Sequence, residues 1–531
     1  MSTLKQLEEM LSQGKISRRE FLARASALGF TAALSPGLLR TTAHAATPKR
    51  GGRFRQGLGG GSTTDTLDPA LNTDAVEGSI MRQVRNYLGE IDYRGIPFPE
   101  LAESWESTPD AAKWVFKLRK GVEFHNGKTM DAEDIIFSIN HHRGEESKSA
   151  AKTLAEPIKD IKADGKHTVV FTLEAGNADF PAVLCNDHFA IAPAGTEGAE
   201  WEKGIGTGGY ILVSHEPGVR CLTKRNPNYW KEGRAHFDEV EILTISDLTA
   251  RTNALITGKV DYINRCDVKT LQLLEKEPGI QVIDVTSPTH YSLPMLTDRP
   301  PYDDNRVRLA LKYAIDREHM VKMILRGYGT VGNDHPIGPT YRFHPTEAEL
   351  PQRKYDPDKA RFHLKKAGME GHVFKLSAAD AAFVGGVDTA VLYEEHAAKA
   401  GIKIEVVREP NDGYWSDVWM KRPWCECYWH GRATTDMMFT SAYAEGAAWN
   451  DSHWSHDRFN KLLKEARAEL DEAKRREMYV EMQRIVRDEG GVVIPMFANL
   501  VQAANNKVRY ENIAGLSEND NARNAERWWF A

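Results

Sequence analysis

One tract of the chain gathers side chains that suit the binding of a small polar molecule. Tyr414 and Trp415 are followed by a short run that contains Trp429, His430 and Arg432. A guanidinium offers a fork of N–H donors that matches a carboxylate or a phosphate, and aromatic rings form flat walls. We therefore predict a ligand-binding site in this tract. The two tryptophans can instead be core residues, and Arg432 can be a surface residue or a bridge between lobes.

A glycine-rich loop near residue 60 is a second candidate contact. Gly59 and Gly60 open a Gly/Ser/Thr segment that runs to Asp68. The segment lacks the G-K-[ST] sequence of phosphate-binding loops, so a nucleotide site is disfavoured. Because glycine lets a backbone come close to a partner, we predict that this loop lies at a ligand cleft.

Catalysis and metal binding have little support in the sequence. The chain contains no G-x-S-x-G and no H-E-x-x-H motif, and we expect neither enzyme activity nor a cofactor. His453 and His456 flank Trp454, but no carboxylate or cysteine stands nearby at ligand spacing, which favours a solvated loop over a metal site. A convergent Ser/His/Asp site leaves no mark in sequence spacing, so a hydrolase stays an alternative.

The N-terminal segment has the features of an export signal. Arg18 and Arg19 precede an apolar stretch, 25–39, that is shorter than the roughly 20 apolar residues of a membrane span. The triplet Ala43-His44-Ala45 is a small-x-small peptidase site, so we expect cleavage after Ala45. The paired arginines resemble the twin-arginine export signal, which implies the twin-arginine translocase as a partner during export. The alternative is a basic amphipathic helix that stays in the cytoplasm.

Composition agrees with an exported protein of more than one lobe. The 531 residues exceed the usual size of a single domain. A balance of 69 basic against 75 acidic residues argues against a nucleic-acid partner, which needs a basic surface. No cysteine stands in or just after the leader and no later segment is apolar enough to span a membrane, so we expect a periplasmic protein that is not a lipoprotein.

The five cysteines set a further expectation. An odd number of thiols in an oxidising compartment leaves at least one unpaired. We expect them to be small buried side chains, with room for one disulfide, and a metal site at the Cys-x-Cys pair is a weaker alternative. The cysteines are Cys185, Cys221, Cys266, Cys425 and Cys427.

Hydrophobic periodicity divides the chain into two kinds of segment. Residues 114–119 and 168–173 alternate as strands, and we read 89–207 as a compact α+β insert. From Gly206 onward, strands and helices alternate in the βα fashion typical of a parallel sheet. Apolar stripes then predict one helix over 304–325 and two helices over about 457–488.

Several blocks of sequence are similar to one family. The protein resembles the peptide/nickel solute-binding proteins of ABC importers, known as family 5. The blocks follow the order of the family along nearly the whole mature chain. They are Ala102-Glu103-Ser104-Trp105, the run from Trp114 to Gly127, Asp131-Ala132-Glu133-Asp134, Gly206-Thr207-Gly208-Gly209-Tyr210, Asn226-Pro227-Asn228-Tyr229-Trp230, the run from Arg299 to Arg308, and Val493-Ile494-Pro495-Met496.

The resemblance implies an α/β, two-lobed periplasmic-binding-protein fold of the class II-like, large cluster C type. An extra α+β domain is inserted in the first lobe, and the chain crosses between the lobes near 298 and 491. The implied boundaries are 1–45 for the signal peptide, 46–88, 208–298 and 492–531 for lobe I, 89–207 for inserted domain Ib, and 299–491 for lobe II.

The resemblance also implies the function. A small peptide or peptide-like polar solute would be held between two closing lobes and passed to ABC permease subunits in the inner membrane. We expect a monomer. A ligand-sensing receptor of the same family is an alternative that the sequence does not separate from transport.

The ligand is where this chain departs from the family. In peptide-binding members, the position that matches Arg432 is typically an aspartate that pairs with the α-amino group of the peptide. A guanidinium repels an amine, which favours an anionic solute or a metal–polycarboxylate chelate as the ligand. An oligosaccharide is a further alternative, because tryptophan rings stack on sugar faces. Three further residues are candidates for ligand binding: His290 and Tyr291 at the predicted crossover, and Asp436 at the last acidic position of the motif. A structural role is the more frequent one for Asp436.

Overall fold

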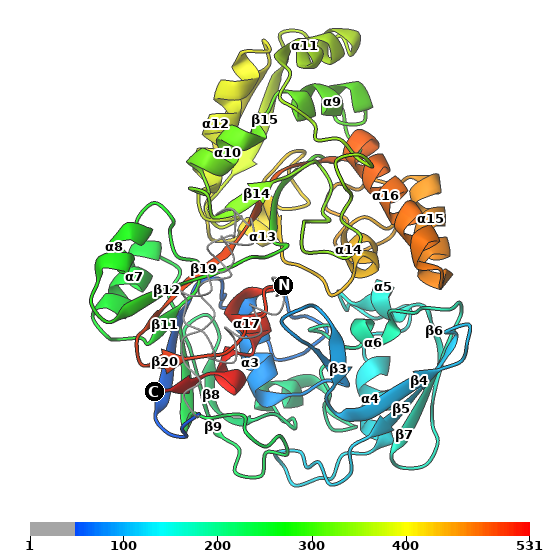
Figure 1. The fold of residues 1–531 in the computed structure, drawn as a ribbon, viewed down its shortest axis with the longest axis vertical. Helices are drawn as coiled ribbons and strands as arrows, with labels where there is room; N and C mark the ends of the chain where they lie inside the picture. Colours follow the sequence, from blue (N-terminus) through cyan, green and yellow to red (C-terminus); the bar gives the residue numbers. More distant parts are fainter. Residues whose placement is uncertain (1–47) are drawn as a thin grey trace, which may run out of the picture. The chain divides into compact units, whose positions relative to one another are not determined.

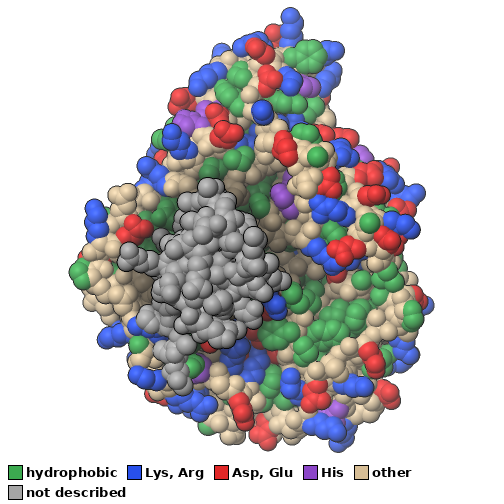
Figure 2. Space-filling view, viewed as in Figure 1, with side chains coloured by type: hydrophobic (Ala, Val, Ile, Leu, Met, Phe, Trp, Pro, Cys, Tyr) green, Lys and Arg blue, Asp and Glu red, His purple; other side chains and the backbone are tan. Residues whose placement is uncertain are grey.

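The computed structural model describes residues 48–531. The predicted export signal, with its cleavage site after Ala45, lies outside the described residues. Residues 49–530 form one compact unit. Among the helices of the described part, none is long and apolar enough to cross a membrane. Basic and acidic side chains are intermingled over the face seen in Figure 2.

A seven-stranded mixed sheet forms the first lobe (Figure 1). Strand β1 (Arg53–Leu58) runs parallel to β10 (Glu239–Thr244) on one side and to β11 (Tyr262–Ile263) on the other. The remaining strands pair antiparallel and give the order β12-β19-β11-β1-β10-β9-β8. They are β8 (Tyr210–Glu216), β9 (Arg220–Arg225), β12 (Ile280–Val285) and β19 (Leu500–Asn505).

The predicted parallel sheet is correct around β1 and wrong for β8 and β9. These two strands form a hairpin, and β9 is antiparallel to β10. The connection between them is too short for a crossover helix, and Gly218 turns there with a φ of +71°. Three helices accompany the sheet. They are α3 (Ala75–Val84), α7 (Leu248–Ile256) and α8 (Leu271–Lys276).

A separate antiparallel sheet lies within the segment predicted as an inserted domain. Its order is β4-β5-β7-β6, and β5 (Lys113–Leu118) and β7 (Thr168–Leu173) confirm the two strands predicted there. Trp114 and Phe116 are buried and alternate with exposed or half-buried residues, as a strand with one wet face requires. The other elements are β2 (Gly89–Ile91), β3 (Pro97–Pro99), β4 (Ala102–Ser107), β6 (Ile158–Ala163), α4 (Ala132–Asn140), α5 (Lys152–Ala155), α6 (Phe180–Val183) and the 3₁₀ helix η2 (Gly198–Lys203).

The second lobe contains a four-stranded antiparallel sheet in the order β14-β18-β13-β17. Strands β13 (His290–Pro294) and β18 (Val492–Ala498) belong to segments predicted as lobe I, yet they pair with β14 (Gly329–Val331) and β17 (Cys427–Trp429). A parallel pair, β15 (Val373–Ala378) and β16 (Lys403–Arg408), packs against α12 (Gly386–Ala398). The two chain passages between the lobes therefore run next to each other through β13 and β18.

Helices enclose the sheets of the second lobe. The helix predicted over 304–325 is two helices, α9 (Asn305–Tyr313) and α10 (Arg317–Met323), because the Asp316 carboxylate caps a new helix by accepting from the N–H of His319. The two helices predicted near 457–488 are confirmed and lie side by side in Figure 1. The remaining helices are α11 (Pro357–Lys366), α13 (Tyr414–Asp417), α14 (Thr435–Ala442), α15 (Asp457–Ala468) and α16 (Glu472–Glu489).

A buried charge network ties the C-terminal segment to the first lobe. Glu100 is fully buried and accepts from Arg523 at 2.9 Å and from Lys231 Nζ at 2.6 Å. Glu526 accepts from the same two cations. Acids and bases compensate one another here, as buried charges require. The elements of this segment are α17 (Glu518–Ala522), α18 (Asn524–Arg527) and the pair β20 (Val508–Arg509) and β21 (Trp529–Phe530).

Candidate functional site

A cavity of about 1150 Å³ lies between the two lobes. Its volume is slightly above the roughly 300–1,000 Å³ that is common for small-molecule sites. Both lobes and the segment predicted as an insert form its walls, so a solute that fills the cavity would contact all three. The main wall segments are 59–64, 72–75, 185–188, 411–416, 427–433 and 516–518.

Eight of the ten residues predicted from the sequence line this cavity. The glycines occupy a tight place: a Cβ on Gly59 would lie 2.7 Å from Nη1 of Arg251, and Gly60 has a φ of +114°, which glycine adopts most readily. The tertiary structure thus brings together segments more than 350 positions apart. The eight lining residues are Gly59, Gly60, Tyr291, Tyr414, Trp415, Trp429, His430 and Arg432.

The other two predicted residues, His290 and Asp436, are not among the lining residues. His290 is fully buried in β13, and burial lowers its pKa to about 3. Asp436 is buried in the first turn of α14, where its carboxylate accepts from Nε of Arg467 at 3.2 Å. Both side chains pack the second lobe behind the cavity wall.

Arg432 lies at one end of the cavity between aromatic rings. Its guanidinium carbon is 5.7 Å from the ring centre of Trp429 and 6.0 Å from that of Trp449. Its backbone N–H donates to the hydroxyl of Tyr341 at 2.7 Å, which fixes the loop after β17. Burial lowers the pKa of Arg432, and the charge of Asp187 opposes that shift.

A second arginine shares this end of the cavity. Arg82 of α3 donates from Nε to Asp187 at 3.1 Å and holds the carboxylate in a salt bridge. His188 beside it has a pKa lowered to about 4, chiefly by burial, and is neutral at pH 7. Arg82 and Asp187 were not predicted from the sequence, since neither belongs to a motif and they are 105 positions apart.

A charged group from three distant segments lies beside His430, whose ring centre is 5.0 Å from that of Tyr428. Nε of Arg265 donates to Glu518 at 2.6 Å, and Nη2 donates to the hydroxyl of Tyr428 at 3.2 Å. Asn264 Nδ2 also donates to Glu518, at 2.8 Å. This group bridges the lobes through Tyr428 of β17, and no sequence signal pointed to it.

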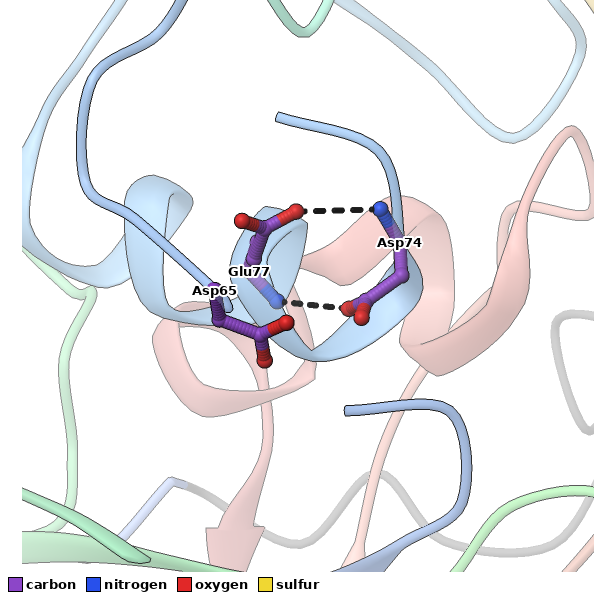
Figure 3. A group of neighbouring side chains, drawn as sticks. All are labelled: Asp65, Asp74 and Glu77. Carbon is purple, nitrogen blue, oxygen red and sulfur yellow. Dashed lines mark hydrogen bonds between the residues drawn. The ribbon is translucent and has the colours of Figure 1, made fainter. Parts of the chain in front are cut away.

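Three carboxylates meet beside the glycine loop (Figure 3). Asp74 accepts from the backbone N–H of Glu77, and Glu77 accepts from that of Asp74, so the two form a capping box for α3. Asp65 is buried next to them, and burial together with the negative charge of Asp74 raises its pKa to about 8. The carboxylates of Asp74 and Glu77 accept hydrogen bonds from backbone N–H groups. A proton on Asp65 removes the repulsion between its carboxylate and that of Asp74.

A cavity walled by two lobes defines this molecule as a two-lobed binding protein. A sequence profile of the bacterial extracellular solute-binding proteins, family 5 (middle region), matches residues 97–451, which is more than half of the chain. The chain belongs to this family.

Individual relatives agree with that assignment. Heme-binding protein A of Haemophilus influenzae is 29% identical over 330 residues, which cover 57% of this chain and 60% of that protein. Di/tripeptide-binding protein 1 of Pseudomonas aeruginosa is 25% identical over 466 residues, covering 80% and 85%. The structure of DppA from Helicobacter pylori in complex with the peptide STSA superposes with a TM-score of 0.81 at 24% identity, covering 91% and 98%. The last comparison shows the shared two-lobed fold.

Proposed function

We propose that this protein is the periplasmic substrate-binding component of an ABC importer and that it captures a small peptide or peptide-like polar solute. The cavity between the lobes carries the proposal: its walls come from both lobes, so a bound solute favours their closure. The names of the relatives, which include a di/tripeptide-binding and a heme-binding protein, support a polar organic ligand. ABC permease subunits are the partners that this role requires.

A melting-temperature screen of the mature form from Ala46 tests the proposal. The panel contains peptides, organic acids, metal chelates and sugars. A ligand at 100 times its dissociation constant adds about 2.7 kcal/mol to the stability of the folded state, which is readily seen as a shift. Small-angle scattering should show a more compact molecule with that ligand. A protein that no member of the panel stabilises would contradict the proposal.

An anionic solute is the second candidate ligand. The buried guanidinium of Arg432 favours it, since a free amine at that place would face a positive charge. Metal–polycarboxylate chelates fall in the same class, whereas an oligosaccharide rests only on the tryptophans of the wall. Replacing Arg432 by alanine should weaken an anionic ligand by about 1.5–3 kcal/mol. Unchanged affinity would remove Arg432 from the site.

The protein is proposed to bind without catalysis. A stoichiometric binder shows one saturable site, and the ligand is recovered unchanged after release. Mass spectrometry of the released ligand checks this, and turnover would favour the hydrolase alternative. A ligand-sensing receptor would bind equally well, so loss of solute uptake on deletion of the permease separates transport from sensing.

Export by the twin-arginine route belongs to the same proposal. The sequence of the leader supports it, with Arg18 and Arg19 before an apolar stretch. Replacing both arginines by lysine should leave the uncleaved precursor in the cytoplasm. N-terminal sequencing of the periplasmic form should begin at Ala46 and find no lipid. The predicted lobe and domain boundaries are also part of the proposal, and limited proteolysis tests them. Light scattering tests the proposed monomeric state.

A further inference from the structure

Two buried polar atoms at one end of the cavity have no hydrogen-bond partner among the residues that the structure describes. They are Nε2 of His430 and Nε of Arg432. Both residues line the cavity, and both follow β17. Buried polar groups in folded proteins are nearly always paired, so a solute or a water molecule in the cavity is the expected partner of these two atoms.

A chain of hydroxyl groups determines which nitrogen of His430 carries its proton. The hydroxyl of Ser287 donates to Oγ1 of Thr289 at 2.8 Å, and Oγ1 of Thr289 lies 3.2 Å from Nδ1 of His430. Since Thr289 accepts from Ser287, its own proton is free to point at Nδ1, which then accepts. Burial lowers the pKa of His430 to about 4, so the ring carries one proton at pH 7. When Nδ1 accepts from Thr289, that proton is on Nε2, and the unpaired atom is a donor.

The charges around these donors leave a surplus of one positive charge. Arg82 and Arg432 are cationic, and Asp187 is the acid that faces both. Arg265 and Glu518 also act on His430, but they form an ion pair and add no net charge. His188 and His430 are neutral at pH 7, since burial lowers the pKa of each to about 4. A group with one negative charge and two acceptor oxygens satisfies both the charge and the two donors. A carboxylate has these properties, whereas a phosphate dianion brings one charge too many.

We propose that His430 and Arg432 form a carboxylate subsite, with Ser287 and Thr289 as positioning residues that hold His430 as an Nε2–H donor. This inference rests on the proposed function and names the chemistry of its ligand. The carboxylate belongs either to an organic acid or to the C-terminus of a peptide. In both cases one oxygen accepts from His430 and the other accepts from Arg432.

Matched acids and amides test the subsite by calorimetry. The probes are Ala-Phe with Ala-Phe-amide, and glutarate with glutaramide, so the two sources of a carboxylate are compared separately. Each acid that binds should do so about 10- to 100-fold more tightly than its amide, the scale of a charged hydrogen bond. Arg432→Gln and His430→Leu should remove that preference. His430→Gln, which can keep a donor near Nε2, should restore part of it, and exposed Arg361→Gln serves as the control.

Nuclear magnetic resonance of the histidine nitrogens tests the same subsite without a physiological ligand. His430, assigned with the His430→Gln variant, should show the Nε2–H tautomer. Thr289→Val should mix the tautomers, and Thr289→Ser should restore the pure form. Sodium acetate up to 100 mM should shift Nε2 in a saturable way in the wild type and not in Arg432→Gln.

The outcomes separate the subsite from the proposed function. Equal affinity of acids and amides, an Nδ1–H tautomer, or no saturable shift with acetate would overturn the subsite and leave a solute-binding protein standing. If no compound in the melting screen binds, the proposed function fails, and the acetate titration and the tautomer then decide the subsite alone.

Discussion

The guanidinium of Arg265 donates a hydrogen bond of 3.2 Å to the hydroxyl of Tyr428 and so joins the two lobes at the wall of the cavity. Arg265 follows β11 of the seven-stranded sheet, whereas Tyr428 lies in β17 of the second lobe. Glu518 holds the guanidinium in place by accepting from its Nε at 2.6 Å. The bond exists only when the lobes are together, so it contributes to the closed state.

Tyr428→Phe should therefore favour opening. The change removes one hydroxyl and keeps the ring. The loss of a single hydrogen bond costs about 0.5–1.5 kcal/mol, so the dissociation constant of the ligand should rise about 2- to 10-fold. Small-angle scattering of the unliganded protein should show a larger radius of gyration. Tyr93→Phe, at an exposed position, is the control, and identical scattering curves would mean that the bond does not hold the lobes together.

Asp65 should make stability fall as the pH rises from about 4 to about 8. Its pKa is raised from 3.8 in the unfolded chain to about 8 in the folded protein, chiefly by burial and then by the charge of Asp74. The folded state then binds the proton more tightly than the unfolded chain does. The stabilisation of the folded state by this proton is complete below about pH 4 and is lost as the pH rises toward 8. Glu77, with a pKa raised to about 7 by burial, adds to the same trend.

The variant Asp65→Asn isolates this effect. Between pH 6.5 and 8.5 the melting temperature of the wild type should fall by about 1–3 °C more than that of the variant. Calorimetric scans at several pH values measure the difference. Glu103→Gln, at an exposed carboxylate, should keep the slope of the wild type. Parallel curves for wild type and Asp65→Asn would show that Asp65 does not hold a proton in this range.

The charge network around Glu100 should matter for stability and not for ligand affinity. Glu100→Ala removes one of the buried carboxylates that balance Arg523 and Lys231 and leaves these cations to Glu90 and Glu526. Breaking such a network costs about 3–5 kcal/mol, which urea unfolding measures. The control is Glu106→Ala, because Glu106 forms an exposed pair with Lys117 and should cost less than about 0.5 kcal/mol. Equal unfolding midpoints for the two variants would contradict the role of the network.

The five cysteines should be inert in the folded protein. All five are buried in the structure and none forms a disulfide, although the sequence allowed one. Burial raises the pKa of each thiol, that of Cys221 to about 12, so little thiolate is present at pH 7. A thiol reagent should label no cysteine in the native state and five in denaturant. Fewer than five in denaturant without a reductant would reveal a disulfide.

Local patterns in the sequence determined much of the fold. Alternation at Trp114 and Phe116 predicts β5, and the apolar stripes near the C-terminus predict α15 and α16, because burial of one face imposes its period on the sequence. The break between α9 and α10 was missed, since the apolar stripe continues through Asp316. The hairpin of β8 and β9 was also missed, because period and composition do not record which strands pair.

The residues of the site also fall into two groups, those predicted from the sequence and those found only in the structure. Sequence by itself pointed to the tract from Tyr414 to Arg432 and to the glycines at 59 and 60, since their residue types suit ligand contact wherever they lie. Only the tertiary structure brought Arg82, Asp187 and Arg265 to the same cavity. Their partners come from segments far away along the chain, and an ion pair leaves no periodic mark. The structure also placed Asp436 behind the wall, because burial and the pairing with Arg467 depend on how the helices pack.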